Sequence, residues 1–185
     1  AGFDVILIET VGVGQSEVTV SEMVDFFLLL LLPGSGDSLQ GIKKGVLELA
    51  DLVAVNKADG ENELRAKQSA RDYQSAMALL SNAGSHWSTP VLTCSALTGQ
   101  GVSTIWDHID DHCTHAQETG AWDRRRSQQQ IRWMWSMVED QLIHNLRNEA
   151  SIAQTVSETE EQVLNGDLSA TEAAKAILAL FKESS

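Results

Sequence analysis

The stretch Asp51-Leu-Val-Ala-Val-Asn-Lys-Ala-Asp59 joins a short apolar run to a polar turn. The run at residues 52–55 is continuous rather than alternating, which is typical of a strand covered on both faces in a parallel sheet. Three further runs of this kind occupy residues 5–8, 26–32 and 91–94. Each of the four runs is therefore predicted to be a strand.

Helical patterns separate these runs, at residues 38–50 and 61–83. Alternating strands and helices predict right-handed βαβ units, and therefore an α/β fold with a partial doubly wound, mainly parallel sheet. Ligands bind such sheets at the carboxyl ends of the strands. The loops that follow the four runs are therefore the expected place for a site.

The second half of the chain is predicted to be all-helical. Residues 124–149 form one long helical pattern, and Asn165-Gly166 is typical of a helix stop. Ser169-Ala-Thr-Glu172 is a capping box that opens a last helix over residues 170–182. We expect two parts, with the sheet in residues 1–119 and a helical extension in residues 120–185.

Charge and composition exclude several classes of protein. The 185 residues contain 13 Lys and Arg against 26 Asp and Glu, a formal net charge of −13. A sequence-independent nucleic-acid binder or a protein of anionic membrane surfaces needs a basic face, so neither partner is expected. The longest apolar run is far shorter than the roughly 20 residues that span a bilayer. The two cysteines, Cys94 and Cys113, provide no disulfide framework, which indicates a reducing compartment.

The polar tetrapeptide Asn56-Lys-Ala-Asp59 follows a predicted buried strand. The Asp59 carboxylate can accept two parallel hydrogen bonds from guanine, one from N1–H and one from the exocyclic amine, and adenine offers no such pair. Asn56 and the stem of Lys57 would brace the loop and cover the base. An ordinary polar turn is the alternative interpretation.

The turn Ser95, Ala96, Leu97 follows the next predicted strand. Its small residues would let backbone N–H groups reach the carbonyl of the base. At the end of the first run, Glu9-Thr-Val-Gly12 places an acidic residue that can hold Mg²⁺ through water, beside a glycine whose N–H can approach a γ-phosphate. Gln15 is a candidate for orienting a water molecule. Glu17 stands where the third glycine of a dinucleotide-binding fingerprint would be, which excludes that interpretation.

Three such motifs in this order are typical of a GTPase, and the sequence resembles the methylmalonyl-CoA-mutase-associated GTPases of the MeaB/ArgK type, in the SIMIBI class of P-loop proteins. The resemblance rests on residues 4–17, 37–45 and 51–59 and runs through most of the chain. It implies GTP and GDP as ligands, Mg²⁺ as cofactor, and a chaperone that gates cofactor loading of an adenosylcobalamin-dependent acyl-CoA mutase and protects it. It also implies a homodimer formed through the C-terminal helices, in the cytoplasm or the mitochondrial matrix.

By the same resemblance, residues 33–44 correspond to a switch that responds to the mutase. Lys43 or Lys44 would then belong to the responsive switches together with Gln15, and Glu9 would act on Mg²⁺ through water. Two other classes stay open at this point. One is a kinase or ATPase associated with arginine or ornithine transport, and the other is a non-catalytic interaction module.

A phosphate-binding loop of the form G-x-x-x-x-G-K-[ST] does not occur in residues 1–185. Members of the resembled family carry it upstream of the Glu9 motif. We therefore expect residues 1–185 to be the C-terminal part of a longer protein. This part alone is expected to bind GTP weakly and not to hydrolyse it.

Three histidines, His108, His112 and His115, lie beside Cys113 on one predicted helical stripe. Their spacing makes a zinc or cobalt site sterically possible, but a solvated helix edge is the favoured interpretation. Further along the chain, Trp133, Trp135 and Met137 are interpreted as helix-packing residues. Residues 124–126, three arginines, are interpreted as solvated or interface charges.

Overall fold

The computed structural model of the chain describes residues 2–10, 16–34, 44–80, 87–148 and 150–184. Contacts divide the chain into two units, Ala1–Gln129 and Gln130–Ser185, and the boundary falls inside one long helix. The division into parts 1–119 and 120–185 stays a prediction. Each unit is described by itself below.

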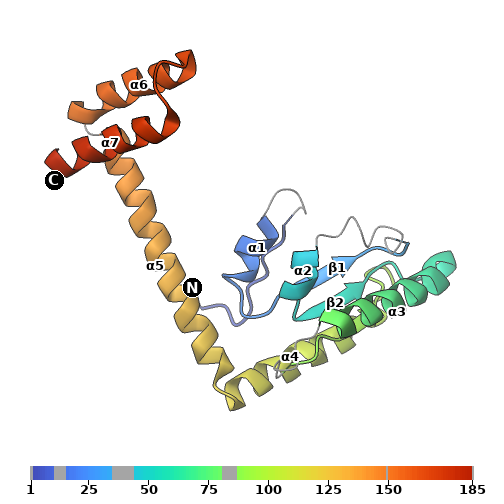
Figure 1. Cartoon of the computed structure of the whole chain (residues 1–185). Helices are drawn as coiled ribbons and strands as arrows, with labels where there is room; N and C mark the ends of the chain where they lie inside the picture. Colours follow the sequence, from blue (N-terminus) through green and yellow to red (C-terminus); the bar gives the residue numbers. More distant parts are fainter. Residues whose placement is uncertain (1, 11–15, 35–43, 81–86, 149, 185) are drawn as a thin grey trace. The chain divides into compact units, whose positions relative to one another are not determined.

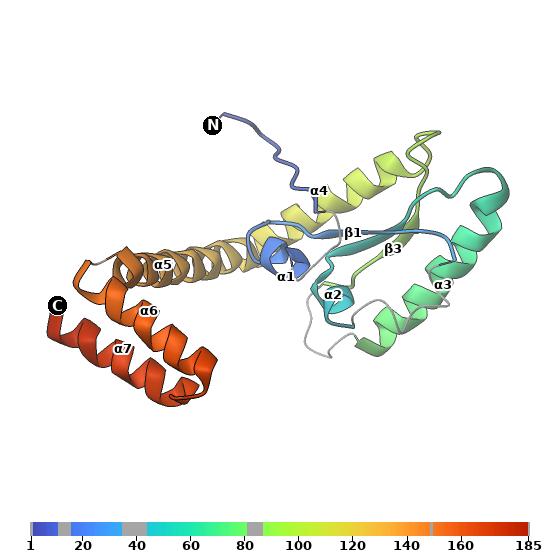
Figure 2. The same cartoon turned by 90° about the horizontal axis from the view of Figure 1, so that it is seen from above.

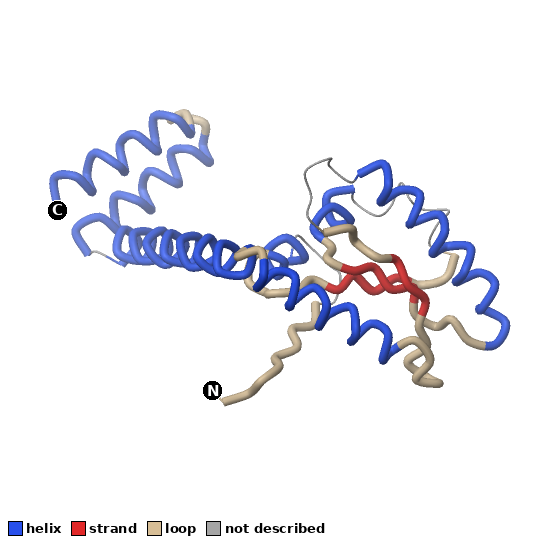
Figure 3. The backbone as a smooth tube through the Cα atoms, turned by 90° about the horizontal axis from the view of Figure 1, so that it is seen from below, coloured by secondary structure: helices blue, strands red, loops and turns tan. Residues whose placement is uncertain are grey.

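The first unit is built on a three-stranded parallel sheet in the order β1-β2-β3 (Figure 1). The strands are β1 (Leu28–Leu31), β2 (Leu52–Val55) and β3 (Val91–Thr93). In the register, Leu28 pairs with Leu52 and Val53 pairs with Val91. Figure 3 shows the strands side by side in one layer. Three of the four predicted strands are therefore confirmed, with slightly shorter bounds for β1 and β3.

Helices cover both faces of this sheet. The short helices are α1 (Ser16–Ser21), α2 (Lys44–Leu49) and the 3₁₀ turn η2 (Gly60–Asn62), and the longer ones are α3 (Glu63–Leu80) and α4 (Val102–Glu118). Figure 2 shows α4 on one side of the sheet and α2 and α3 on the other.

Burial on both faces of the sheet explains why strand β2 is apolar at every position. Its four side chains are all fully buried. Val53 and Val55 join the cluster with Tyr73 of α3, whereas Leu52 and Ala54 join the cluster with Ile105 of α4. Successive strand residues point to opposite faces, so a strand between two helical layers needs apolar residues throughout. The predicted α/β fold, with a partial, parallel sheet between helical layers, is thus confirmed.

Residues 5–8 do not form the predicted strand. They adopt no regular structure and are exposed, with Leu7 at 85%. A strand is stable only when its backbone groups pair with a neighbour, and none of the strands in the described ranges pairs with this run. The apolar pattern of residues 5–8 was therefore not sufficient to predict a strand. The predicted helix over residues 38–50 appears as α2, and residues 35–43 lie outside the described ranges.

The histidine stripe of α4 is partly buried, which corrects the interpretation as a solvated edge. The His112 ring meets Phe26 and Trp87 edge-on, with centroids 5.0 and 4.9 Å away. Its Nε2 lies 3.6 Å from Oδ1 of Asp51, the residue that precedes β2. Burial lowers the pKa of His112, an effect that Asp51 partly offsets. Within the described ranges no three His, Cys, Asp or Glu side chains gather as a metal site would require.

Helix α5 (Ala121–Asn148) begins against the first unit. Arg125 Nη1 donates to Asp51 Oδ2 at 3.0 Å, and Arg126 makes a two-pronged contact with Asp25 at 2.8 and 2.7 Å. The guanidinium of Arg126 also lies 4.6 Å from the ring centroid of Trp122. Two of the three arginines therefore bind specific carboxylates rather than serving as solvated charges.

The second unit contains the rest of α5 with α6 (Ala150–Asn165) and α7 (Ala170–Ser184). The predicted capping box is confirmed, since Ser169 Oγ accepts from the Glu172 N–H at 3.3 Å and donates to the Glu172 carboxylate at 2.7 Å. Trp133, Trp135 and Met137, predicted to pack between helices, are instead exposed on α5. Of the described helices, none has the length and apolar character to cross a membrane.

Candidate functional site

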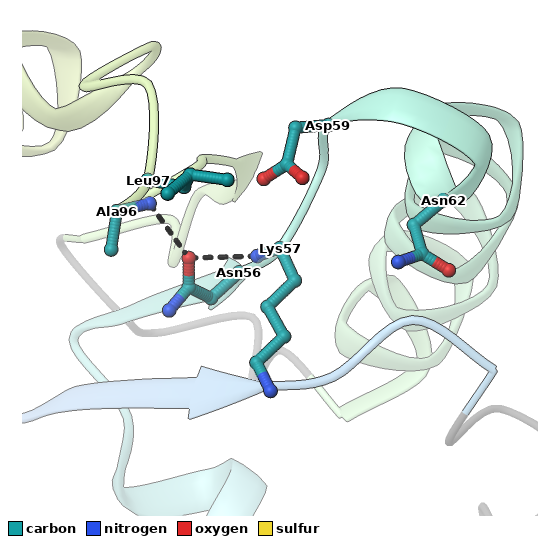
Figure 4. Close-up of a pocket in the computed structure, with 6 residues that line it drawn as sticks. All are labelled: Asn56, Lys57, Asp59, Asn62, Ala96 and Leu97. Atoms are coloured by element: carbon teal, nitrogen blue, oxygen red, sulfur yellow. Dashed lines mark hydrogen bonds between the residues drawn. The ribbon is translucent and has the colours of Figure 1, made fainter.

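An open pocket of about 440 Å³ lies where β2 and β3 end (Figure 4). This volume falls within the usual range of small-molecule sites. It lies at the carboxyl ends of parallel strands, where α/β sheets bind ligands. The pocket is lined by Asn56, Lys57, Asp59, Asn62, Ala96 and Leu97.

The chain turns sharply as it leaves β2. Lys57 has φ = 60°, a left-handed backbone conformation that is uncommon for a residue with a side chain. Its N–H donates to Asn56 Oδ1 at 2.7 Å, and the Ala58 N–H donates to the Cys94 carbonyl at 2.9 Å. These two hydrogen bonds hold the turn against the end of β3. Strain of this kind persists where surrounding contacts fix the backbone, and it is often found at functional sites.

Asn56 ties the two loops of the pocket together. Its side-chain Oδ1 accepts the Lys57 N–H and, from the other loop, the Ala96 N–H at 3.1 Å (Figure 4). Neighbouring Cys94 is buried, and burial raises the pKa of its thiol, so it stays neutral. The Leu97 side chain on the second loop is 85% exposed and borders the pocket. An exposed apolar surface beside polar groups suits a flat, aromatic ligand.

Asp59 is held from behind by Ser95. Ser95 is fully buried, and its hydroxyl donates to Asp59 Oδ2 while accepting the Thr98 N–H at 3.2 Å. The backbone N–H of Ser95 donates to the Gln100 carbonyl at 2.9 Å. A carboxylate has about four acceptor positions, so Asp59 keeps free positions for a ligand. The serine thus fixes the direction of the carboxylate without saturating it.

Gly101 closes the second loop and begins α4. It has φ = 75°, and a Cβ at this position would lie 2.5 Å from the Thr93 carbonyl oxygen. Only glycine fits such a close approach in the left-handed region. The loop at residues 95–101 is therefore folded tightly against β3, which sets the position of Ser95 and Ala96.

The structure brings together one of the two predicted groups of site residues. Asn56, Lys57, Asp59, Ala96 and Leu97 line the pocket, and Ser95 lies directly behind it. One residue was missed by the sequence reasoning. Asn62, three positions after Asp59, also lines the pocket, and its place one tight turn beyond the tetrapeptide is the signal that could have found it.

Of the second predicted group, Glu9 is the residue whose side chain the structure describes. Glu9 is exposed in an irregular segment and does not line the pocket. Gly12, Gln15 and Lys43 lie outside the described ranges, and Lys44 begins α2 with a side chain that is likewise undescribed. The carboxylate of Glu9 is a ligand type that Mg²⁺ accepts directly or through water, and its role in holding the ion stays a prediction.

The chain is similar to known proteins over nearly all of its length. A family profile described as "Methylmalonyl Co-A mutase-associated GTPase MeaB" matches residues 1–151. A Caulobacter vibrioides protein, named only as a GTPase, is 50% identical over 98% of this chain and 55% of its own length. The mouse "Methylmalonic aciduria type A homolog, mitochondrial" is 40% identical over 98% of this chain and 44% of its own length.

A solved structure shares the fold as well. The chain superposes on the crystal structure titled "LAO/AO transport system kinase" with a TM-score of 0.76 and 35% identity, over 98% of this chain and 58% of that one. The chain spans about half the length of the curated relatives that it matches. The similarity therefore covers the pocket, the sheet and the C-terminal helices described above.

Proposed function

This chain belongs to the family of methylmalonyl-CoA mutase-associated GTPases, and on that premise we propose that its protein binds guanine nucleotides through the pocket at Asp59 and hydrolyses GTP. One observation carries the proposal: the Asp59 carboxylate is held by buried Ser95 and points into an open pocket.

Base selection follows from the acceptor character of Asp59. Guanine presents N1–H and an exocyclic amine in parallel, and a carboxylate with two free acceptor positions matches both donors. Adenine presents an unprotonated N1 at the same place, so its binding would leave the carboxylate without partners. Sites that hydrogen-bond one ligand reject an analogue lacking the donors because the buried acceptor is then unsatisfied.

The rest of the pocket complements the face and edge of a purine. The Lys57 stem extends along one side in Figure 4, where it would cover the base, and Leu97 provides apolar surface. Asn56 already uses its carbonyl oxygen to hold Ala96, so its role is to keep the two loops at a fixed separation. Hydrolysis itself is proposed for the whole protein with Mg²⁺ as its cofactor, and Glu9 is the residue of this chain that would hold the ion through water.

The family also supports a proposal about partners. We propose that the protein acts as a chaperone of an adenosylcobalamin-dependent acyl-CoA mutase, gating cofactor loading and protecting it, in the cytoplasm or the mitochondrial matrix. A homodimer through α5 to α7 is part of this proposal. Its support is an apolar stripe on α5 that is exposed in the single chain, formed by Ile131, Trp135, Val138 and Leu142. Large apolar side chains gathered in an exposed stripe favour an interface.

The experiment that tests the function compares nucleotides in the full-length protein. GTP is expected to bind and be hydrolysed far better than ATP, and a cobalamin-dependent acyl-CoA mutase is expected to change the rate. Equal use of ATP would favour the kinase or ATPase of arginine or ornithine transport, because such an enzyme gains nothing from Asp59. Binding of the mutase with no nucleotide turnover would favour a non-catalytic module.

A further inference from the structure

Asn62 lines the guanine pocket, yet the tetrapeptide that identifies the site ends three residues earlier, at Asp59. Asp59 precedes the 3₁₀ turn η2, and the Asn62 N–H donates to the Asp59 carbonyl at 3.0 Å. Asp59 itself is extended at the start of the turn, and the side chains of Asp59 and Asn62 both line the pocket. The turn therefore brings the Asn62 amide to the same pocket that the Asp59 carboxylate faces.

The close-up agrees with this placement. Figure 4 shows the Asp59 carboxylate and the Asn62 amide bordering the same open space, with Leu97 on the opposite side of the carboxylate. Asn62 is exposed, and in the described ranges its side-chain amide makes no hydrogen bond. Rotation of an asparagine amide about its last bond is broad and nearly two-fold. The amide is thus free to present either its oxygen or its nitrogen to a ligand.

The exocyclic amine of guanine has two N–H groups, and Asp59 can accept only the one beside N1. The second points toward the N3 side of the base, away from the carboxylate. We propose that Asn62 Oδ1 accepts this second N–H, so that Asp59 and Asn62 together read the 2-amino group. This inference rests on the proposed function, and it makes Asn62 a specificity-determining residue for guanine over purines without that amine.

Inosine nucleotides provide the direct probe, because hypoxanthine keeps N1–H and O6 of guanine and lacks only the 2-amino group. Calorimetry of the full-length protein with GDP and IDP is expected to show tighter binding of GDP. Asn62→Ala should weaken GDP about three- to tenfold, the range of one neutral hydrogen bond, and leave IDP within about twofold. Glu61→Ala, in the same turn but outside the pocket lining, is the matched control and should change neither.

Three results of these binding measurements distinguish a failure of the Asn62 proposal from a failure of the proposed function. If Asn62→Ala weakens GDP and IDP equally, Asn62 contacts the sugar or the ring and not the amine, and the inference is wrong. If it changes neither while GDP remains far tighter than ADP, the inference is wrong and the proposed function stands. If the unmodified protein does not prefer GDP to ADP, the proposed function fails and the inference fails with it.

Discussion

Replacement of Gly101 by alanine tests how the pocket loop is held against the sheet. Two costs add at this position. The left-handed conformation at φ = 75° costs about 1–2 kcal/mol for a residue with a Cβ. The added Cβ would also lie 2.5 Å from the Thr93 carbonyl oxygen and 3.2 Å from Cys94 Cα, which are backbone atoms at the end of β3 and directly after it. Moving backbone to relieve such overlap costs about 1–3 kcal/mol.

The total expected loss for Gly101→Ala is about 2–5 kcal/mol in the free energy of unfolding. Gly99→Ala is the matched control, because Gly99 has φ = 78° in the same loop and nothing within 4 Å of its added Cβ. Gly99→Ala should lose only the free energy that the left-handed conformation costs a residue with a Cβ. Alanine restricts the unfolded chain equally in both variants, so the difference between them isolates the overlap.

Urea unfolding of both full-length variants, followed by circular dichroism, measures the difference directly. Gly101→Ala should be less stable than Gly99→Ala by about 1–3 kcal/mol. It should also bind GDP more weakly, since the loop carries Ser95 and Ala96. Equal stability of the two variants would refute the close approach of the loop to β3.

Two other predictions concern the contacts around Asp51. Arg125→Ala should destabilise the protein by about 1–3 kcal/mol in urea unfolding, because it removes a charged partner from the mostly buried carboxylate of Asp51. Arg126→Ala breaks a more exposed ion pair, with Asp25, and should cost about 1 kcal/mol or less. Equal losses in the two variants would contradict this ranking. Since burial lowers the pKa of His112, the unfolded chain takes up a proton more readily than the folded one, so stability should fall as the pH drops from about 7 through 6.5 toward 5. His112→Gln should flatten this dependence, and an unchanged slope would show that another group is responsible.

Much of the sheet could be predicted from the sequence, because a strand buried on both faces must be apolar throughout. The run at residues 52–55 met that condition and is β2 in full. The run at residues 5–8 met it too and is not a strand, since an apolar pattern does not reveal which backbone will pair with it. The helices of the second half could be predicted from the spacing of their apolar residues and from their capping motifs. Both the Gly166 stop and the Ser169 capping box are found in the structure.

The site could be predicted only as far as its motif extends. Asn56 and Asp59 were identifiable because their chemistry depends on position directly after a strand. Asn62 was missed because it lies beyond the motif, and only its position one tight turn after Asp59 indicates that it reaches the pocket. The burial of His112 was missed for a similar reason. Its neighbours Trp87 and Asp51 are distant in sequence, and spacing along one helix says nothing about what packs on it.

Asp59 is proposed to select guanine, and exchange of its carboxylate for an amide removes the acceptor on which this selection depends. Asp59→Asn replaces an acceptor facing N1–H with a group that can donate, and the loss of two charge-assisted hydrogen bonds corresponds to about 3–6 kcal/mol, or roughly 10² to 10⁴ in affinity. Xanthine carries an oxygen at C2, which can accept from the new amide. Calorimetry of the full-length protein should therefore show GDP weakened and XDP strengthened in the variant. Unchanged GDP affinity, with no gain for XDP, would show that Asp59 does not contact the base and does not select guanine.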